Sequence, residues 1–137
     1  MAQDSHHNKT PLRILVVDDN IDAAETLSML LELNGHNAHT AHDGLEAIKL
    51  AVAFKPQVIF LDIAMPDMNG YETAEAIRKT YGLENVIIVA LTGWDAESER
   101  IRSGETRFNY LLTKPVQIDQ INSLLATLNF SQQRETI

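Results

Sequence analysis

The sequence lacks cysteine altogether, which excludes disulfides and thiolate metal sites. Basic residues are also scarce, because 11 lysines and arginines stand against 19 aspartates and glutamates and give a net charge of −8. Nucleic-acid binding needs a basic surface patch, so this balance argues against such a partner. The apolar runs fall far short of the roughly 20 residues that cross a membrane, and the first residues contain no apolar signal-peptide segment.

These absences favour a cytoplasmic protein, and the length of the chain favours a single domain. The chain has 137 residues, of which 45% are hydrophobic, and this is enough for a single domain with a buried core. We expect the domain to cover residues 12–130. A disordered N-terminal tail at residues 1–11 and a polar C-terminal tail at residues 131–137 are expected to flank it.

Five short apolar runs are predicted to be strands, because they are unbroken and rich in valine and isoleucine, as in a parallel sheet buried on both faces. The runs cover residues 13–17, 37–41, 57–61, 86–91 and 108–112. The second run is weakly apolar, which favours a place at the edge of the sheet.

Amphipathic segments between these runs predict five helices. They cover residues 22–34, 44–54, 71–80, 95–103 and 117–129. The fourth has only one large apolar residue, Ile101, and is expected to be short or mobile. Asp22 and Glu25 form a candidate capping box at the start of the first helix. The expected buried stripes of the first two helices are Leu27, Leu30 and Leu31, and Leu45, Ile48 and Val52.

Alternation of strands and helices predicts an α/β fold with βαβ crossovers and a parallel sheet. About 120 residues are too few for an eight-fold barrel. A doubly wound five-stranded sheet remains, and the order 2-1-3-4-5 provides an edge position for the weak second strand.

Charged and hydroxyl side chains follow four of the predicted strands at the point where each strand ends. Asp18 and Asp19 follow the first, Asp62 the third, Thr92 the fourth and Lys114 the fifth. The carboxyl ends of parallel strands meet at one edge of the sheet, where ligands bind, so we expect these residues to lie close together.

Three carboxylates at one edge would repel one another, and a divalent cation would relieve that repulsion. Oxygen ligands with an incomplete protein shell suit Mg²⁺. The alternative is that adjacent Asp18 and Asp19 merely cap the next helix, although Asn20 or Asp22 could do so alone. Together with Asp62, they favour the metal site.

Asp62 has the chemistry of a phosphoryl acceptor, because a carboxylate can attack phosphorus and become an aspartyl phosphate. Such a transfer needs in-line positioning and neutralised charge, which Mg²⁺, Lys114 and the Thr92 hydroxyl would supply. Taken singly, Thr92 is equally a strand-end residue and Lys114 a solvated loop lysine. The isomer of the Lys114-Pro115 peptide bond stays open.

The stretches "VVDDN", "FLDIAMPDMNGYE", "ALTGW" and "LLTKPV" resemble the response-regulator receiver domain of two-component signalling, most like receivers of hybrid histidine kinases or stand-alone ones. The resemblance covers nearly the whole domain. It implies a flavodoxin-like fold and Mg²⁺-dependent phosphorylation of Asp62 by a partner's phosphohistidine. It also implies Asp19 as a direct metal ligand, Asp18 as a ligand through water, and the carbonyl of Ala64 as the third protein ligand. Thr92 and Lys114 carry over as the switch hydroxyl and the phosphate-binding lysine.

These observations predict a phosphorylation-controlled binding module, either a monomer or a weak dimer. A histidine kinase or histidine phosphotransfer protein would be its partner, and the bound phosphate would hydrolyse slowly. One rival function is a Mg²⁺-dependent phosphatase with Asp67 as general acid. Another rival is a receiver that is never phosphorylated and acts only through binding.

Two positions depart from the family pattern. Leu111 stands where relatives often carry an aromatic switch residue, and the neighbouring Tyr110 is expected on the opposite face of the strand. A relay from Thr92 to an aromatic ring is therefore in doubt. Arg107 stands where many relatives carry glycine, which predicts a differently shaped loop before the fifth strand.

Three further groups of residues are candidate sites. His36, His39 and His42 lie three apart, but a strand would point them to alternating sides, so exposed edge histidines are expected rather than a zinc site. Trp94 either packs on the surface or gates access to Asp62, and gating is favoured. Arginines late in the fourth crossover predict a solvated face, with partner recognition as a hypothesis. They are Arg100, Arg102 and Arg107.

Overall fold

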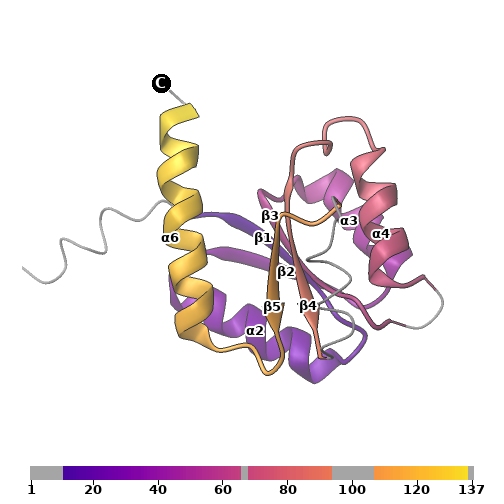
Figure 1. The fold of residues 1–137 in the computed structure, drawn as a ribbon, viewed down its shortest axis with the longest axis horizontal. Coiled ribbons are helices and arrows are strands. Elements are labelled where there is room, and N and C mark those ends of the chain that lie inside the picture. Colours follow the sequence, from indigo (N-terminus) through magenta and orange to yellow (C-terminus); the bar gives the residue numbers. More distant parts are fainter. Residues whose placement is uncertain (1–10, 66–67, 94–106, 136–137) are drawn as a thin grey trace, which may run out of the picture.

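The structure is a computed structural model, and it describes residues 11–65, 68–93 and 107–135, with side chains through Leu128. The strands are β1 (Arg13–Val17), β2 (Asn37–Ala41), β3 (Val58–Asp62), β4 (Ile87–Thr92) and β5 (Tyr110–Thr113). The helices of the described part are α2 (Ile21–Leu33), α3 (Gly44–Phe54), α4 (Gly70–Arg78) and α6 (Ile118–Glu135). Figure 1 shows the strands at the centre with helices on either side.

All four strand pairings are parallel, and the strand order is β2-β1-β3-β4-β5. The predicted α/β class, the doubly wound sheet and the edge position of the second strand are therefore confirmed. The order reverses direction at β1 and β3, because β2 lies to one side of β1 and the later strands lie to the other. Ligands of such sheets bind at this switch point, beyond the carboxyl ends of the two strands.

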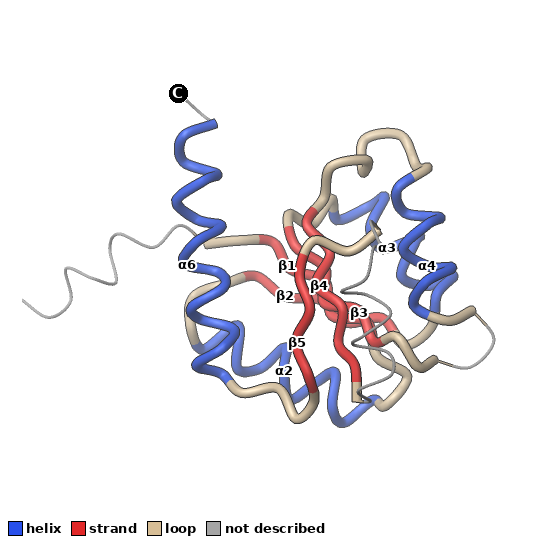
Figure 2. Tube along the Cα trace, in the orientation of Figure 1, coloured by secondary structure: helices blue, strands red, loops and turns tan. Residues whose placement is uncertain are grey.

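Two apolar layers hold the helices on opposite faces of the sheet. On one face, α3 and α4 cover side chains such as Leu15, Ile59 and Ile88. On the other face, α2 and α6 cover the alternate positions of the same strands, such as Val16 and Phe60. Figure 2 shows this arrangement, with α3 and α4 on one side of the strands and α2 and α6 on the other. None of the described helices is both long and apolar enough to span a bilayer.

Helix ends differ from the prediction at two places. The side chain of Asn20, not Asp22, caps α2, because it accepts the N–H of Ala23 at 3.0 Å. The predicted capping box of Asp22 and Glu25 is therefore wrong. Helix α6 continues to Glu135, beyond the predicted end at residue 129, so its last turns lie in the segment expected to be a tail.

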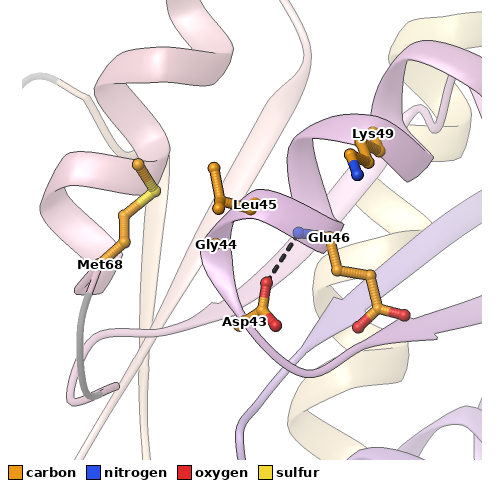
Figure 3. A pocket seen from close by; sticks show the side chains of 6 residues that line it. All are labelled: Asp43, Gly44, Leu45, Glu46, Lys49 and Met68. Atoms are coloured by element: carbon orange, nitrogen blue, oxygen red, sulfur yellow. Dashed lines mark hydrogen bonds between the residues drawn. The ribbon is translucent and has the colours of Figure 1, made fainter.

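The predicted buried stripe of α3 is confirmed only at Ile48, which packs against the core, and is wrong at Leu45 and Val52. Leu45 and Val52 are 65% and 48% exposed, whereas Ala47 and Ala51 are fully buried against the sheet. Small side chains let this helix lie close to the sheet, so the larger residues are left on its outer side. Figure 3 shows Leu45 beside Met68 at a shallow pocket of about 350 Å³.

Candidate functional site

Three carboxylates gather at the switch point between β1 and β3. Asp18 and Asp19 directly follow β1, and Asp62 is the last residue of β3. One oxygen of each carboxylate lies within 4.8 Å of the others. Asp18 and Asp62 are buried, both at 4% exposure, and Asp19 is exposed. The cluster therefore has a buried floor and one carboxylate that faces solvent.

Lys114 brings a positive charge to the same place from the loop after β5, the edge strand two positions away from β3. Its Nζ lies 3.2 Å from Oδ1 of Asp62 and 3.5 Å from Oδ2 of Asp18. Its main-chain N–H donates to the carbonyl of Thr92 at 2.6 Å, which ties the start of the loop after β5 to the end of β4. The Lys114-Pro115 bond is cis.

Main-chain N–H groups fix the two buried carboxylates. The N–H of Asn20 donates to Oδ1 of Asp18 at 3.0 Å, and the N–H of Ala64 donates to Oδ1 of Asp62 at 3.1 Å. Each carboxylate therefore has one oxygen held by its own loop. Hydrogen bonds from backbone donors also stabilise the charged form of a carboxyl group.

The pKa of Asp62 is nonetheless raised above its ordinary value. Burial is the main cause and the charge of Asp18 adds to it, while Lys114 and the Ala64 N–H oppose them. Burial would lower the pKa of Lys114, but the charges of Asp62 and then Asp18 outweigh it, and that pKa is raised. In the protein alone, burial and the charge of Asp18 therefore outweigh the stabilisation that Lys114 and the Ala64 N–H give to the charged form of Asp62.

The charge balance of the cluster suits a divalent cation. Three carboxylates and one ammonium group leave two negative charges uncompensated. Oxygen donors in an open site fit Mg²⁺, which keeps several waters and takes one or two carboxylates. Asp18, Asp19 and Asp62 could hold such an ion, and Asp62 would then present its remaining oxygen to a phosphoryl group.

The raised pKa of Asp62 predicts a pH-dependent effect on stability without metal. The folded state keeps the Asp62 proton to a higher pH than the unfolded state, so this group destabilises the fold as pH rises above about 4. Asp62→Asn is therefore expected to be more stable than the unsubstituted protein at pH 7 in EDTA. We expect a gain of about 0.5–2 kcal/mol, the range that single stabilising substitutions commonly give.

Urea unfolding of both proteins, in EDTA and at several pH values, measures this difference. The gap is expected to be small at pH 3 and to widen by pH 7. Millimolar Mg²⁺ is expected to stabilise the unsubstituted protein more than the variant, because only the former offers all three carboxylates. A variant less stable than the unsubstituted protein at pH 7 would show that the pair with Lys114 outweighs burial and repulsion.

Thr92 lies at the end of β4, one strand away from Asp62. It is 2% exposed, and in the sheet Leu91, the residue before it, is paired with Asp62. The structure thus places Thr92 at the same edge as the carboxylates. Leu111 packs into the apolar layer beneath α3 and α4, whereas Tyr110 is exposed on the other face, as predicted.

Arg107 is held against α4 within the domain. Its Nη1 lies 3.0 Å from Oε1 of Glu75, and its guanidinium carbon lies 5.7 Å from the ring centroid of Tyr71. The carbonyl of Arg107 accepts two hydrogen bonds from Arg78, at 3.2 and 3.0 Å. Sequence reasoning missed Arg78, because its partners are mostly main-chain carbonyls that no side-chain motif reveals.

The three spaced histidines lie in different surroundings. His36 is buried, and its Nδ1 accepts the N–H of Leu12 at 3.1 Å, so its predicted exposure is wrong. His39 is exposed, and the centroid of its ring lies 4.1 Å from the ring centroid of Phe54. His42 is half-buried and contacts the carbonyl of Asp18.

Several predicted features fall outside the described residues. They are Asp67, Trp94, Arg100, Arg102 and the helix at residues 95–103.

The fold and the site together define an α/β domain that gathers carboxylates and a lysine at the switch point of a parallel sheet. The family model of the response regulator receiver domain matches residues 14–126. The chain belongs to this family, the receiver domains of two-component signalling.

Known relatives agree with this assignment. Response regulator MprA of Mycobacterium sp. (strain KMS) is 33% identical over 118 residues, which cover 86% of this chain and 50% of that protein. The chain therefore spans about half the length of this curated relative. Chemotaxis response regulator CheY4 of Vibrio cholerae is 29% identical with a TM-score of 0.77, covering 86% of this chain and 98% of that one.

A third relative bears on the acidic cluster. The receiver domain of a sensor histidine kinase from Pseudomonas aeruginosa PAO1 has a magnesium ion coordinated in its active-site cleft. It is 25% identical to this chain, with a TM-score of 0.74, and the match covers 85% of this chain and 95% of that one.

Proposed function

We propose that this domain accepts a phosphoryl group on Asp62 from a phosphohistidine of a partner protein, in a reaction that depends on Mg²⁺. The observation that carries the proposal is the position of the Asp62 carboxylate. One of its oxygens lies within 4.8 Å of an oxygen of Asp18 and of Asp19, and the ammonium group of Lys114 lies 3.2 Å from its Oδ1. A phosphoryl group on Asp62 would therefore lie near both the bound ion and the positive charge of Lys114.

The residues of the chain have distinct tasks in this reaction. Asp19 would bind the ion directly, Asp18 through water and Ala64 through its carbonyl. When bound, Mg²⁺ supplies positive charge that offsets the negative phosphoryl oxygens. An oxygen of Asp62 attacks phosphorus, the O–P bond forms as the N–P bond breaks, and the imidazole leaves with the electron pair. Lys114 neutralises one phosphoryl oxygen, and the Thr92 hydroxyl donates a hydrogen bond to another.

The phosphorylated domain would then bind partners differently from the unphosphorylated one. A phosphoryl group that Thr92 and Lys114 contact favours the arrangement in which both residues reach it, which shifts the population of the domain. A histidine kinase or a histidine phosphotransfer protein is the partner class that supplies the phosphohistidine. The aspartyl phosphate would hydrolyse slowly, and the setting would be cytoplasmic.

Acetyl phosphate tests this proposal, because it supplies a phosphoryl group without any partner protein. With Mg²⁺, we expect one phosphoryl group per chain by intact-mass spectrometry, and with EDTA we expect none. Sustained release of phosphate far beyond one equivalent per chain, together with hydrolysis of p-nitrophenyl phosphate, would indicate a phosphatase instead. A protein that binds Mg²⁺ but takes no label from acetyl phosphate or from any phosphohistidine donor would be a binding module only.

A further inference from the structure

The three carboxylates of the cluster differ in how they are held. Asp18 and Asp62 each accept a main-chain N–H and pair with Lys114. Within the described parts of the chain, no hydrogen bond or ion pair reaches the exposed carboxylate of Asp19. The direction of the Asp19 side chain therefore depends on the main chain that carries it.

That main chain is fixed from the neighbouring strand. The peptide unit that joins Asp18 to Asp19 is planar, and the carbonyl of Asp18 is its oxygen. The Nδ1 atom of His42 lies 3.1 Å from this carbonyl oxygen. On the other side of the residue, the N–H of Asp18 donates to the carbonyl of Ala41 at 3.0 Å. The bond to Ala41 holds the preceding peptide unit, and the contact with His42 holds the peptide plane from which Asp19 departs.

His42 is itself held in place by the start of α3. Its N–H donates to Oε1 of Glu46 at 2.9 Å, and the N–H of Glu46 donates to Oδ1 of Asp43 at 2.8 Å. Figure 3 shows the Asp43–Glu46 contact at the first turn of the helix. The main chain of His42 is therefore held by the first turn of α3, and the residue is half-buried with its ring against the loop after β1.

We infer that His42 is a positioning residue for the magnesium site, acting through the carbonyl of Asp18 on the direction of Asp19. A carbonyl oxygen only accepts, so the imidazole donates, and Nδ1 carries the hydrogen. This inference rests on the proposed Mg²⁺ site and adds to it a residue that touches neither the ion nor the phosphoryl group. Removing the donor frees the peptide plane and lets Asp19 turn away from the ion.

Two substitutions of nearly equal shape test the inference. In His42→Asn the side-chain nitrogen occupies the place of Nδ1 and keeps a donor, whereas His42→Leu puts a methyl group there. We expect His42→Leu to weaken Mg²⁺ binding about 3- to 10-fold, at or below the low end of the roughly 10- to 100-fold typical when a direct partner of a ligand is lost. His42→Asn is expected to bind Mg²⁺ with an affinity within about twofold of that of the unsubstituted protein.

Isothermal titration of Mg²⁺ into each folded protein gives the affinities, and circular dichroism confirms that the variants fold. His39→Leu is the matched control, because His39 is exposed on β2, three residues before His42, and lies against Phe54 rather than the loop after β1. Equal Mg²⁺ affinity in His42→Leu and the unsubstituted protein would overturn the inference and leave the proposed function intact. Equal weakening in the Asn and Leu variants would also overturn it, since shape rather than the donor would then matter. Absence of Mg²⁺ binding in the unsubstituted protein would overturn the proposed function and the inference with it.

Discussion

Asp62→Asn is expected to abolish phosphorylation by acetyl phosphate and Mg²⁺, with a fall of at least about 100-fold in labelling rate, because the nucleophile itself is lost. An amide oxygen carries no negative charge and does not form a stable bond to phosphorus. The fold is expected to survive, since the asparagine oxygen can still accept the Ala64 N–H that now reaches Oδ1 of Asp62. Intact-mass spectrometry after a fixed incubation measures the label.

Asp43→Asn is the matched control for this loss. Asp43 is exposed and caps α3 by accepting the N–H of Glu46, a role that asparagine also fills. Labelling of Asp43→Asn is therefore expected to equal that of the unsubstituted protein. If Asp62→Asn were still labelled at the original rate, another residue would be the phosphoryl acceptor. Asp18 would be tested first, because it too is buried beside Lys114.

Sequence was sufficient to place the candidate site because the sheet is parallel. Short apolar runs located the five strands to within two residues at either end, and their carboxyl ends necessarily share one edge. Asp19, Asp62 and Lys114 are separated by 43 and 52 positions in the chain, yet the topology alone brings them together. The location of polar residues at strand ends can therefore be predicted from the sequence without knowledge of any side-chain contact.

Contacts that depend on the details of packing could not be predicted from the sequence in this way. The apolar pattern of α3 pointed to Leu45 and Val52, but the helix buries its alanines because it lies so close to the sheet. His36 is buried because its ring accepts a main-chain N–H, which no spacing rule indicates. The contact of His42 with Asp18 likewise joins a ring to a backbone carbonyl across two strands.

Gly70→Ala is expected to cause the largest loss of stability among single substitutions near the site. A Cβ at Gly70 would lie 2.7 Å from both the carbonyl oxygen of Asp62 and the Cα of Ile63. These are main-chain atoms, so the clash is relieved only if α4 or the end of β3 moves. The N–H of Gly70 also donates to the carbonyl of Ile63 at 3.0 Å, and that bond would lengthen. We expect a loss of about 2–4 kcal/mol in the free energy of unfolding, measured by urea denaturation.

Gly44→Ala is the control for Gly70→Ala, because a Cβ at Gly44 would meet side-chain atoms rather than main-chain atoms. A Cβ at Gly44 would lie 2.5 Å from Sδ of Met68 and 2.6 Å from Oγ1 of Thr73. The methionine can turn aside, and the buried Thr73 hydroxyl, which donates to the carbonyl of Asn69, must shift slightly, so we expect a smaller cost of about 1–2 kcal/mol. Gly70→Ala should also weaken Mg²⁺ binding, because the displaced segment carries Asp62, whereas Gly44→Ala should not. If Gly70→Ala were as stable as the unsubstituted protein and bound Mg²⁺ equally well, the contact of α4 with the end of β3 would have to be looser than the structure shows. The position of the nucleophile would then depend on β3 and the Ala64 N–H rather than on the close approach of α4.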